Sequence, residues 1–224
     1  MSSRAPFFVE STVQCHGTTT INVVYTNMCV KVEEWIAKVE AVLAASTVKL
    51  VGVDLEYTTK LRYSPQKVAV LQLCVGTDVL VYHLCHADKK CEKVGEFLWG
   101  YRYVFAGFAI VQDKKVLANS ELYIHNFKDI QSVWRDPDNT RKRTQGLKDV
   151  AAAIIDPYYL NMKDGFGDAE HRMWSDRPPL PDKHLEYAAR DAYATYEVYR
   201  KLDVYESGFF SLFKNSEKKR ARYW

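Results

Sequence analysis

Residues 51–56 read VGVDLE, and this short apolar run determines how the rest of the chain is interpreted. An apolar strand of this kind belongs inside a sheet, where both of its faces are buried. Asp54 and Glu56 interrupt it, and side chains two positions apart in a strand point to the same face. Two carboxylates are thus aimed at one spot. Either they lie past the strand end in solvent, or a divalent cation offsets the cost of burying them together.

Two other segments carry acidic residues that can converge on this strand. Tyr187 and Asp191 are four positions apart, so a helix over residues 182–204 places them on one face. A phenol there can orient a water molecule while the carboxylate holds a metal ion, although a core tyrosine beside a surface aspartate has the same spacing. Asp113 follows the apolar run 104–111, where the chain leaves a strand and where an aspartate can equally begin a helix.

The remaining pattern predicts one α/β domain, with a mixed sheet of five or six strands flanked by helices. Gly76 marks the turn of an antiparallel hairpin, and residues 126–133 fit neither helix nor strand clearly. Strands are expected at 18–26, 48–56, 67–75, 79–84 and 103–109, and helices at 31–45, 92–99, 113–119, 147–155 and 182–204. We expect a flexible tail at 1–17, the domain at 18–210 and a basic tail at 211–224.

Composition narrows the class of protein only partly. The net charge of +3 is too small to identify a nucleic-acid binder, but it allows a local basic groove. No stretch approaches the ~20 apolar residues of a membrane span, so no membrane association is expected. The five cysteines form no CxxC pair, and the crowding of Cys85, His86 and Cys91 fits no usual zinc spacing. An odd number of cysteines favours a reducing compartment, hence a cytoplasmic or nuclear protein.

Considered together, these segments resemble the DEDD exonuclease superfamily of ribonuclease H-like fold, in its tyrosine-bearing subclass. The first motif reads VGVDLEYT, the second VFAGFAIVQDKKVL and the third MWSDRPPLPDKHLEYAARDAYATYEVY. The run GLKDVAAAII is similar to the helix that follows the second motif. The resemblance covers about residues 45–205 and is closest to the Werner-syndrome-type exonuclease domain and to ribonuclease D. The linker 161–173 differs from the family's usual run.

The resemblance implies a metal-dependent 3′→5′ exonuclease that releases nucleoside 5′-monophosphates. Its oxygen-only ligands suit two ions of Mg²⁺ or Mn²⁺. Asp54 would bridge both ions, and Glu56 with Asp191 would complete the catalytic metal site. Asp113 would hold the second ion through water, and Tyr187 would position the attacking water.

The partner implied is a nucleic acid, RNA or DNA, with a single-stranded or recessed 3′ end. In the family, side chains near Leu55 and Tyr57 touch the terminal base, and Trp174 of the third motif is assigned to substrate binding as well. The loop 57–66 is basic and aromatic, which leaves the substrate preference open. Three residues of a further expected loop either hold phosphates or form a solvated charge run: Arg141, Lys142 and Arg143.

A catalytically inactive scaffold of the same fold, binding nucleic acid or protein, is the alternative to an enzyme. Retention of all four acids favours the enzyme, since a decayed member usually loses at least one. Some relatives form rings, so a homo-oligomer is compatible with the resemblance.

Overall fold

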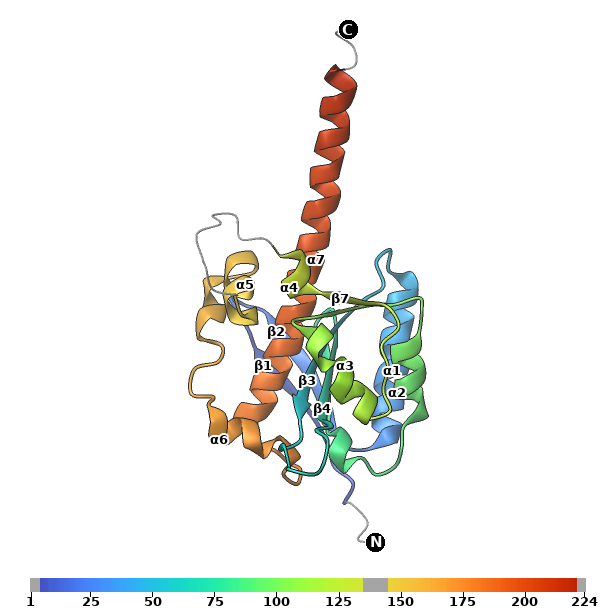
Figure 1. Cartoon of the computed structure of the whole chain (residues 1–224), viewed down its shortest axis with the longest axis vertical. Coiled ribbons are helices and arrows are strands. Elements are labelled where there is room, and N and C mark those ends of the chain that lie inside the picture. The colour runs from blue at the N-terminus through green and yellow to red at the C-terminus, as the bar shows by residue number, and fades with distance from the viewer. Residues whose placement is uncertain (1–4, 135–144, 221–224) are drawn as a thin grey trace.

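Seven strands form one mixed sheet in the computed structural model, which describes residues 5–134 and 145–220, without the side chains of 112 and 203–220 (Figure 1). The strand order is β1-β2-β5-β4-β3-β6-β7. β3 pairs antiparallel with β4 and parallel with β6, so it lies inside the sheet, as its apolar run predicts. The strands are β1 (Phe8–Gln14), β2 (Thr20–Thr26), β3 (Leu50–Tyr57), β4 (Val68–Val75), β5 (Asp78–Tyr82), β6 (Val104–Gly107) and β7 (Phe127–Asp129).

Helices cover both faces of this sheet. The first three helices, α1 (Cys29–Ala45), α2 (Glu92–Trp99) and α3 (Ile110–Asn119), pack on one face, and α5 (Leu147–Ile154) and α7 (Asp182–Arg220) pack on the other (Figure 1). The spacing of Val32, Ile36, Val39 and Leu43 in α1 places all four side chains in the core, as predicted. The shorter segments are α4 (Ile130–Val133), α6 (Asp168–His171), η1 (Leu84–His86), η2 (Pro157–Asn161) and η3 (Arg172–Ser175).

The helix α7 lies directly against β3, and this close approach builds the polar site described below. A Cβ on Gly52 would lie 2.7 Å from the Cβ of Tyr196 and 2.8 Å from the carbonyl oxygen of Ala192. Any side chain at position 52 would therefore push the helix off the strand. Glycine allows the helix face that carries Tyr187 and Asp191 to rest on β3.

The structure confirms the α/β class, the mixed sheet and the hairpin at Gly76, but it has seven strands rather than five or six. Residues 8–14, expected within a flexible tail, pair with β2 along their full length. This edge strand is mostly exposed, so its sequence lacks the alternation of buried apolar residues that reveals a strand. The last helix continues to Arg220, across the expected start of a tail at 211. Within the described ranges, no helix combines the length and the apolar character that a membrane span requires.

Candidate active site

The face of β3 that meets α7 carries Asp54 and Glu56, as the alternation along the strand predicts. Val53 and Leu55 point the other way, into the apolar core beneath α1 and α2. Glu56 is only 8% exposed, so its carboxylate is nearly removed from water. Burial raises the pKa of both acids, and the charge of the neighbouring Asp191 raises each pKa further.

The helix α7 supplies the second pair, Tyr187 and Asp191, from one face of its first turns. Asp191 is 2% exposed, and its Oδ1 atom has no hydrogen-bond partner among the described residues. Its other oxygen, Oδ2, accepts a hydrogen bond of 2.8 Å from the Lys163 ammonium, which also donates to the Tyr187 hydroxyl at 2.8 Å. One cation thus holds both functional side chains of the helix.

Asp113 reaches the same region from the first turn of α3. Tyr57, at the end of β3, donates its hydroxyl hydrogen to the Asp113 carboxylate, so the strand and the helix are tied beside the acids. Burial raises the pKa of Asp113, the bond from Tyr57 opposes that rise, and the charge of Asp129 adds to it. The charge of Asp113 also contributes to the raised pKa of Asp54, so the three segments interact electrostatically.

The entrance to α3 is fixed by Asp129, a residue that the sequence did not single out. Its carboxylate accepts hydrogen bonds from the backbone N–H groups of Ala109 at 3.0 Å, Val111 at 3.3 Å and Gln131 at 2.9 Å. Ala109 adopts a left-handed conformation, with φ of 58°, at the sharp turn from β6 into α3. Asp129 therefore stabilises the turn that presents Asp113.

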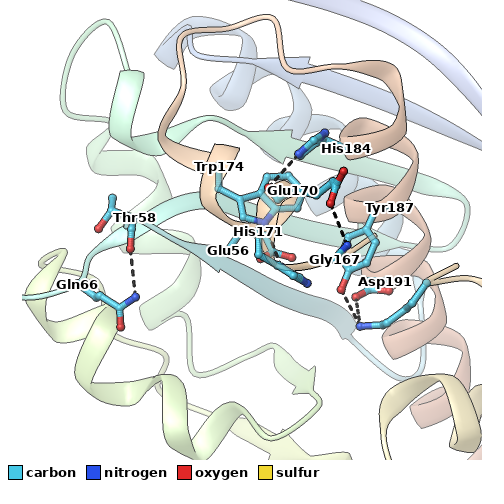
Figure 2. A network of polar contacts seen from close by, with 11 residues as sticks. Glu56, Thr58, Gln66, Gly167, Glu170, His171, Trp174, His184, Tyr187 and Asp191 are labelled. Carbon is cyan, nitrogen blue, oxygen red and sulfur yellow. Dashed lines mark hydrogen bonds and ion pairs between the residues drawn. The ribbon is translucent and has the colours of Figure 1, made fainter. Parts of the chain in front are cut away.

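The segment before α7 forms the wall of the site. The Phe166 ring stacks on Tyr187 with centroids 4.0 Å apart, and His171 Nδ1 lies 3.8 Å from Glu56 Oε2. The hydrogen bond with Glu56 raises the pKa of His171, although partial burial opposes the rise. Figure 2 shows the side chains of Glu56, His171, Tyr187 and Asp191 gathered where this segment, the strand and the helix meet.

The donor set fits a hard divalent cation. Four carboxylates supply oxygen atoms only, which suits Mg²⁺ or Mn²⁺ better than softer metals. Burial raises the pKa of all four groups, which means that the fold alone does not supply enough positive charge. The unpartnered Oδ1 of Asp191 is a ready acceptor for a cation.

The carboxylates nevertheless do not crowd as tightly as the ligands of one ion. Across 5–134 and 145–202, the groups of three or more His, Cys, Asp or Glu whose ligand atoms lie within 4.8 Å of one another are His83 with Cys85 and His86, and Cys29 with Glu33 and Cys91. No three of the four acids meet this limit. The ammonium of Lys163 partly neutralises Asp191, which reduces but does not remove the cost of placing these acids together.

Neither of the tighter groups has the chemistry of a metal centre. His83 uses both ring nitrogens in hydrogen bonds, to Tyr25 and to the carbonyl oxygen of Trp174. Burial raises the pKa of the Cys29 thiol beyond the physiological range, so it stays protonated. Cys91 joins Cys29 rather than Cys85 and His86, so the crowding of these residues in the sequence does not persist in space.

Two substrate-binding residues expected from the sequence lie elsewhere. Trp174 is 1% exposed and packs in the core against Phe166 and His184, so it supports the wall of the site instead of facing a substrate. Leu55 is 5% exposed and lies on the apolar side of the sheet. Both corrections have the same cause, because a motif gives a position in the chain but not the depth of a side chain. The basic run Arg141, Lys142 and Arg143 lies outside the described residues.

Lys163, which the sequence did not single out, contacts both Tyr187 and Asp191. It belongs to the linker 161–173, the stretch that departs from the family pattern, and it follows the short helical segment η2. No periodicity relates it to Asp191, because loop geometry and not helical spacing brings them together. The only signal was a single basic residue in an atypical segment beside an acidic motif.

An α/β sheet with acids converging from a central strand and two helices defines a nuclease class of fold and site. The family model described as 3′–5′ exonuclease matches residues 24–204, and the chain belongs to this family of hydrolases. It is a 3′–5′ exonuclease, and divalent-metal dependence is a property of the family. No curated protein matches the sequence at a significant level.

Solved structures support the fold. The chain is similar to the exonuclease domain of Aedes aegypti Nibbler, with 15% identity, a TM-score of 0.60 and coverage of 83% of this chain and 88% of that one. Trypanosoma brucei RNase D in complex with GMP has 17% identity and a TM-score of 0.65 over 80% of this chain and 56% of its own. Escherichia coli RNase D has 18% identity and a TM-score of 0.59 over 77% of this chain and 42% of its own. The chain thus spans about half the length of these RNase D proteins.

Proposed function

We propose that this exonuclease shortens RNA from a single-stranded or recessed 3′ end, with Asp54, Glu56, Asp113 and Asp191 holding two Mg²⁺ or Mn²⁺ ions. The observation that carries the proposal is the convergence of four carboxylates, three buried and Asp54 partly buried, each with a raised pKa, beside one tyrosine-bearing helix face. Bound divalent cations would supply charge stabilisation and Lewis acidity at the scissile phosphate. The products would be nucleoside 5′-monophosphates.

Tyr187 orients the attacking water in this proposal as a neutral phenol. Burial raises its pKa, with the charge of Asp191 adding to the rise, so the hydroxyl keeps its proton at neutral pH. The hydroxyl oxygen accepts from Lys163 and the hydroxyl also interacts with the Asp191 carboxylate, so its hydrogen points among the acids as a donor. Lys163 and the stacked ring of Phe166 fix the phenol in place. Tyr187 is therefore a positioning hydrogen-bond donor and not a general base.

RNA is the substrate class that two of the similar structures support. Among the similar structures, T. brucei RNase D was solved in complex with an RNA, U12, and the E. coli RNase D is described as an exoribonuclease involved in structured RNA processing. Both proteins are less than 20% identical to this chain, and RNA is therefore proposed, not established, as its substrate. The five free cysteines support a cytoplasmic or nuclear setting, because thiols stay reduced there.

The test is stepwise shortening of 5′-labelled RNA and DNA strands of the same sequence, single-stranded or with recessed 3′ ends, in Mg²⁺ or Mn²⁺. We expect RNA to be shortened faster, and chelation by EDTA to stop the reaction. The variant Asp54→Asn should lose activity on the order of 10⁴-fold, the scale on which one member of an interdependent catalytic set acts.

The matched control is Glu186→Gln, which removes an exposed acid of α7 that pairs with Arg190. It should retain full activity and stability within about 0.5 kcal/mol. Without divalent cations, Asp54→Asn should be at least as stable as the wild type, because it removes a buried charge. Full activity in Asp54→Asn would overturn the assigned site, and no shortening of any strand would overturn the proposed function.

A further inference from the structure

The loop between β3 and β4 borders the acidic site and encloses a second cavity. It begins directly after Tyr57, which bonds to Asp113, and it faces the second half of α3, the helix that carries Asp113 in its first turn. Residues of the loop and of α3 line a cavity of about 430 Å³, within the size range of small-ligand pockets. Lys115, two positions after Asp113, forms part of its wall. The loop that follows β3 and the helix α3 thus connect this cavity to the acidic site.

Hydrogen bonds hold this loop in place from both sides. Asn119 of α3 donates to the carbonyl oxygen of Gln66 at 2.9 Å, and Gln66 itself donates to the carbonyl oxygen of Thr58 at 3.1 Å (Figure 2). On the other side, the backbone N–H of Thr59 donates to the Ser175 hydroxyl at 3.3 Å. A ligand that binds here meets a loop that is already ordered, so binding costs less conformational entropy.

The side chains on this loop have the chemistry of a strand-binding surface. Tyr63 is 86% exposed, and the Arg62 guanidinium carbon lies 5.3 Å from the centre of its ring. Lys60, Arg62 and Lys115 are exposed cations, and none of them forms an ion pair with a described residue. The cavity lining contains no aspartate or glutamate. An exposed aromatic ring among unpaired cations is the combination that binds single-stranded nucleic acids.

We propose that this loop is a subsite for nucleotides that lie two or more positions to the 5′ side of the scissile bond, with Tyr63 stacking on the base of one of them. Lys60, Arg62 and Lys115 contact the phosphates on either side of that base. The proposal rests on the proposed function, since it needs a strand whose 3′ end lies at Asp54 and its neighbours. It explains why an exposed tyrosine and three unpaired cations gather on one cavity between the loop and α3.

The first experiment measures binding of a fluorescently labelled single-stranded RNA to the Asp54→Asn protein, by anisotropy at several salt concentrations. Adding Tyr63→Ala should weaken binding about tenfold through the loss of one stacked base. The triple change Lys60→Ala, Arg62→Ala and Lys115→Ala should also reduce the slope of log K against log salt by about 2, from three phosphate contacts of about 0.7 each.

Matched controls separate this site from general effects of charge and exposure. Tyr101 is 76% exposed and precedes β6, whose pairing with Leu50 places it at the opposite end of β3 from the acids. Tyr101→Ala should leave RNA binding unchanged. A second triple change removes the same charge from α1 and α2, and it should leave the salt slope within error: Lys31→Ala, Lys38→Ala and Lys93→Ala.

The second experiment compares cleavage of a dinucleotide and of a longer strand by chains that keep Asp54. We expect Tyr63→Ala to cleave the dinucleotide at the wild-type rate but to lose about tenfold in kcat/KM on the longer strand. Equal loss on both substrates, or wild-type binding by the loop variants, would overturn the subsite. If the wild type cleaves neither substrate, the proposed function fails instead, and the binding experiment still decides on the loop.

Discussion

Two buried tyrosines on the same side of the sheet have opposite surroundings. Around Tyr187, the acids of the site are short of positive charge, and the Oδ1 atom of Asp191 has no hydrogen-bond partner among the described residues. Around Tyr25, the polar side-chain atoms of Tyr25 and His83 are paired: the Tyr25 hydroxyl donates to His83 Nδ1 at 2.9 Å and accepts from the backbone N–H of Leu180 at 3.0 Å. His83 Nε2 donates in turn to the carbonyl oxygen of Trp174 at 3.1 Å.

The presence or absence of unpaired polar groups distinguishes the ligand-binding site around Tyr187 from the structural network around Tyr25. A fully paired neutral network needs no ligand, and it joins β2, the segment after β5 and the chain before α7. The acidic cluster is costly by itself and becomes favourable only when cations arrive. Removing a hydroxyl should therefore have opposite consequences in the two places, on turnover in one and on stability in the other.

Of the changes that test this comparison, Tyr187→Phe is expected to have the largest effect. Loss of the hydroxyl that orients the attacking water should reduce kcat on the order of 10³-fold, within the range of positioned proton-handling groups. Stability should change by less than about 1 kcal/mol, because Lys163 keeps its ion pair with Asp191. Single-turnover cleavage and denaturant unfolding measure the two quantities.

Tyr193→Phe is the matched control, since Tyr193 lies on the same helix, is 6% exposed and stacks beside His16, away from the acids. It should retain wild-type kcat. An unchanged kcat in Tyr187→Phe, or an equal loss in both variants, would contradict the assignment of Tyr187.

The positions of side chains that follow from strand or helix periodicity could be predicted from the sequence. The two-residue repeat of β3 placed Asp54 and Glu56 on one face, and the four-residue spacing of α7 placed Tyr187 beside Asp191. Lys163 could not be predicted, because a loop brings it to Asp191 and no periodic spacing encodes that contact.

How deeply a side chain is buried was the other property that strand and helix periodicity does not determine. Leu55 and Trp174 stand in or beside the acidic motifs, yet both side chains are buried away from the open side of the site. The strand β1 was missed for the opposite reason, since its residues are largely exposed and its pairing with β2 is set by backbone hydrogen bonds. Backbone pairing of an exposed edge strand does not require a particular pattern of side chains, so the sequence does not reveal it.

The next effect concerns pH and the paired network. Burial, reinforced by the charge of His86, lowers the pKa of His83 from 6.5 to about 4. Below pH 6.5 the unfolded chain binds a proton that the folded chain refuses until about pH 4. The free energy of unfolding should therefore fall as pH decreases through this window, by about 3 kcal/mol in total at about 1.4 kcal/mol per pKa unit.

The variant His83→Gln isolates this contribution, because it has no titrating group at position 83. We expect its unfolding free energy to depend less steeply on pH between 6.5 and 4 than that of the wild type, whatever its absolute stability. Parallel curves for the two proteins in urea titrations would show that His83 is not the proton-linked group.

The smallest effect is expected from Tyr25→Phe, the counterpart of the change at Tyr187. The variant leaves the N–H of Leu180 and Nδ1 of His83 without partners in a buried place, which should cost about 2 kcal/mol of unfolding free energy. Turnover per folded molecule should not change, since Tyr25 contacts none of the four acids. If Tyr25→Phe lowered kcat while leaving stability intact, the division between scaffold and site would be wrong, and the network would belong to the catalytic machinery.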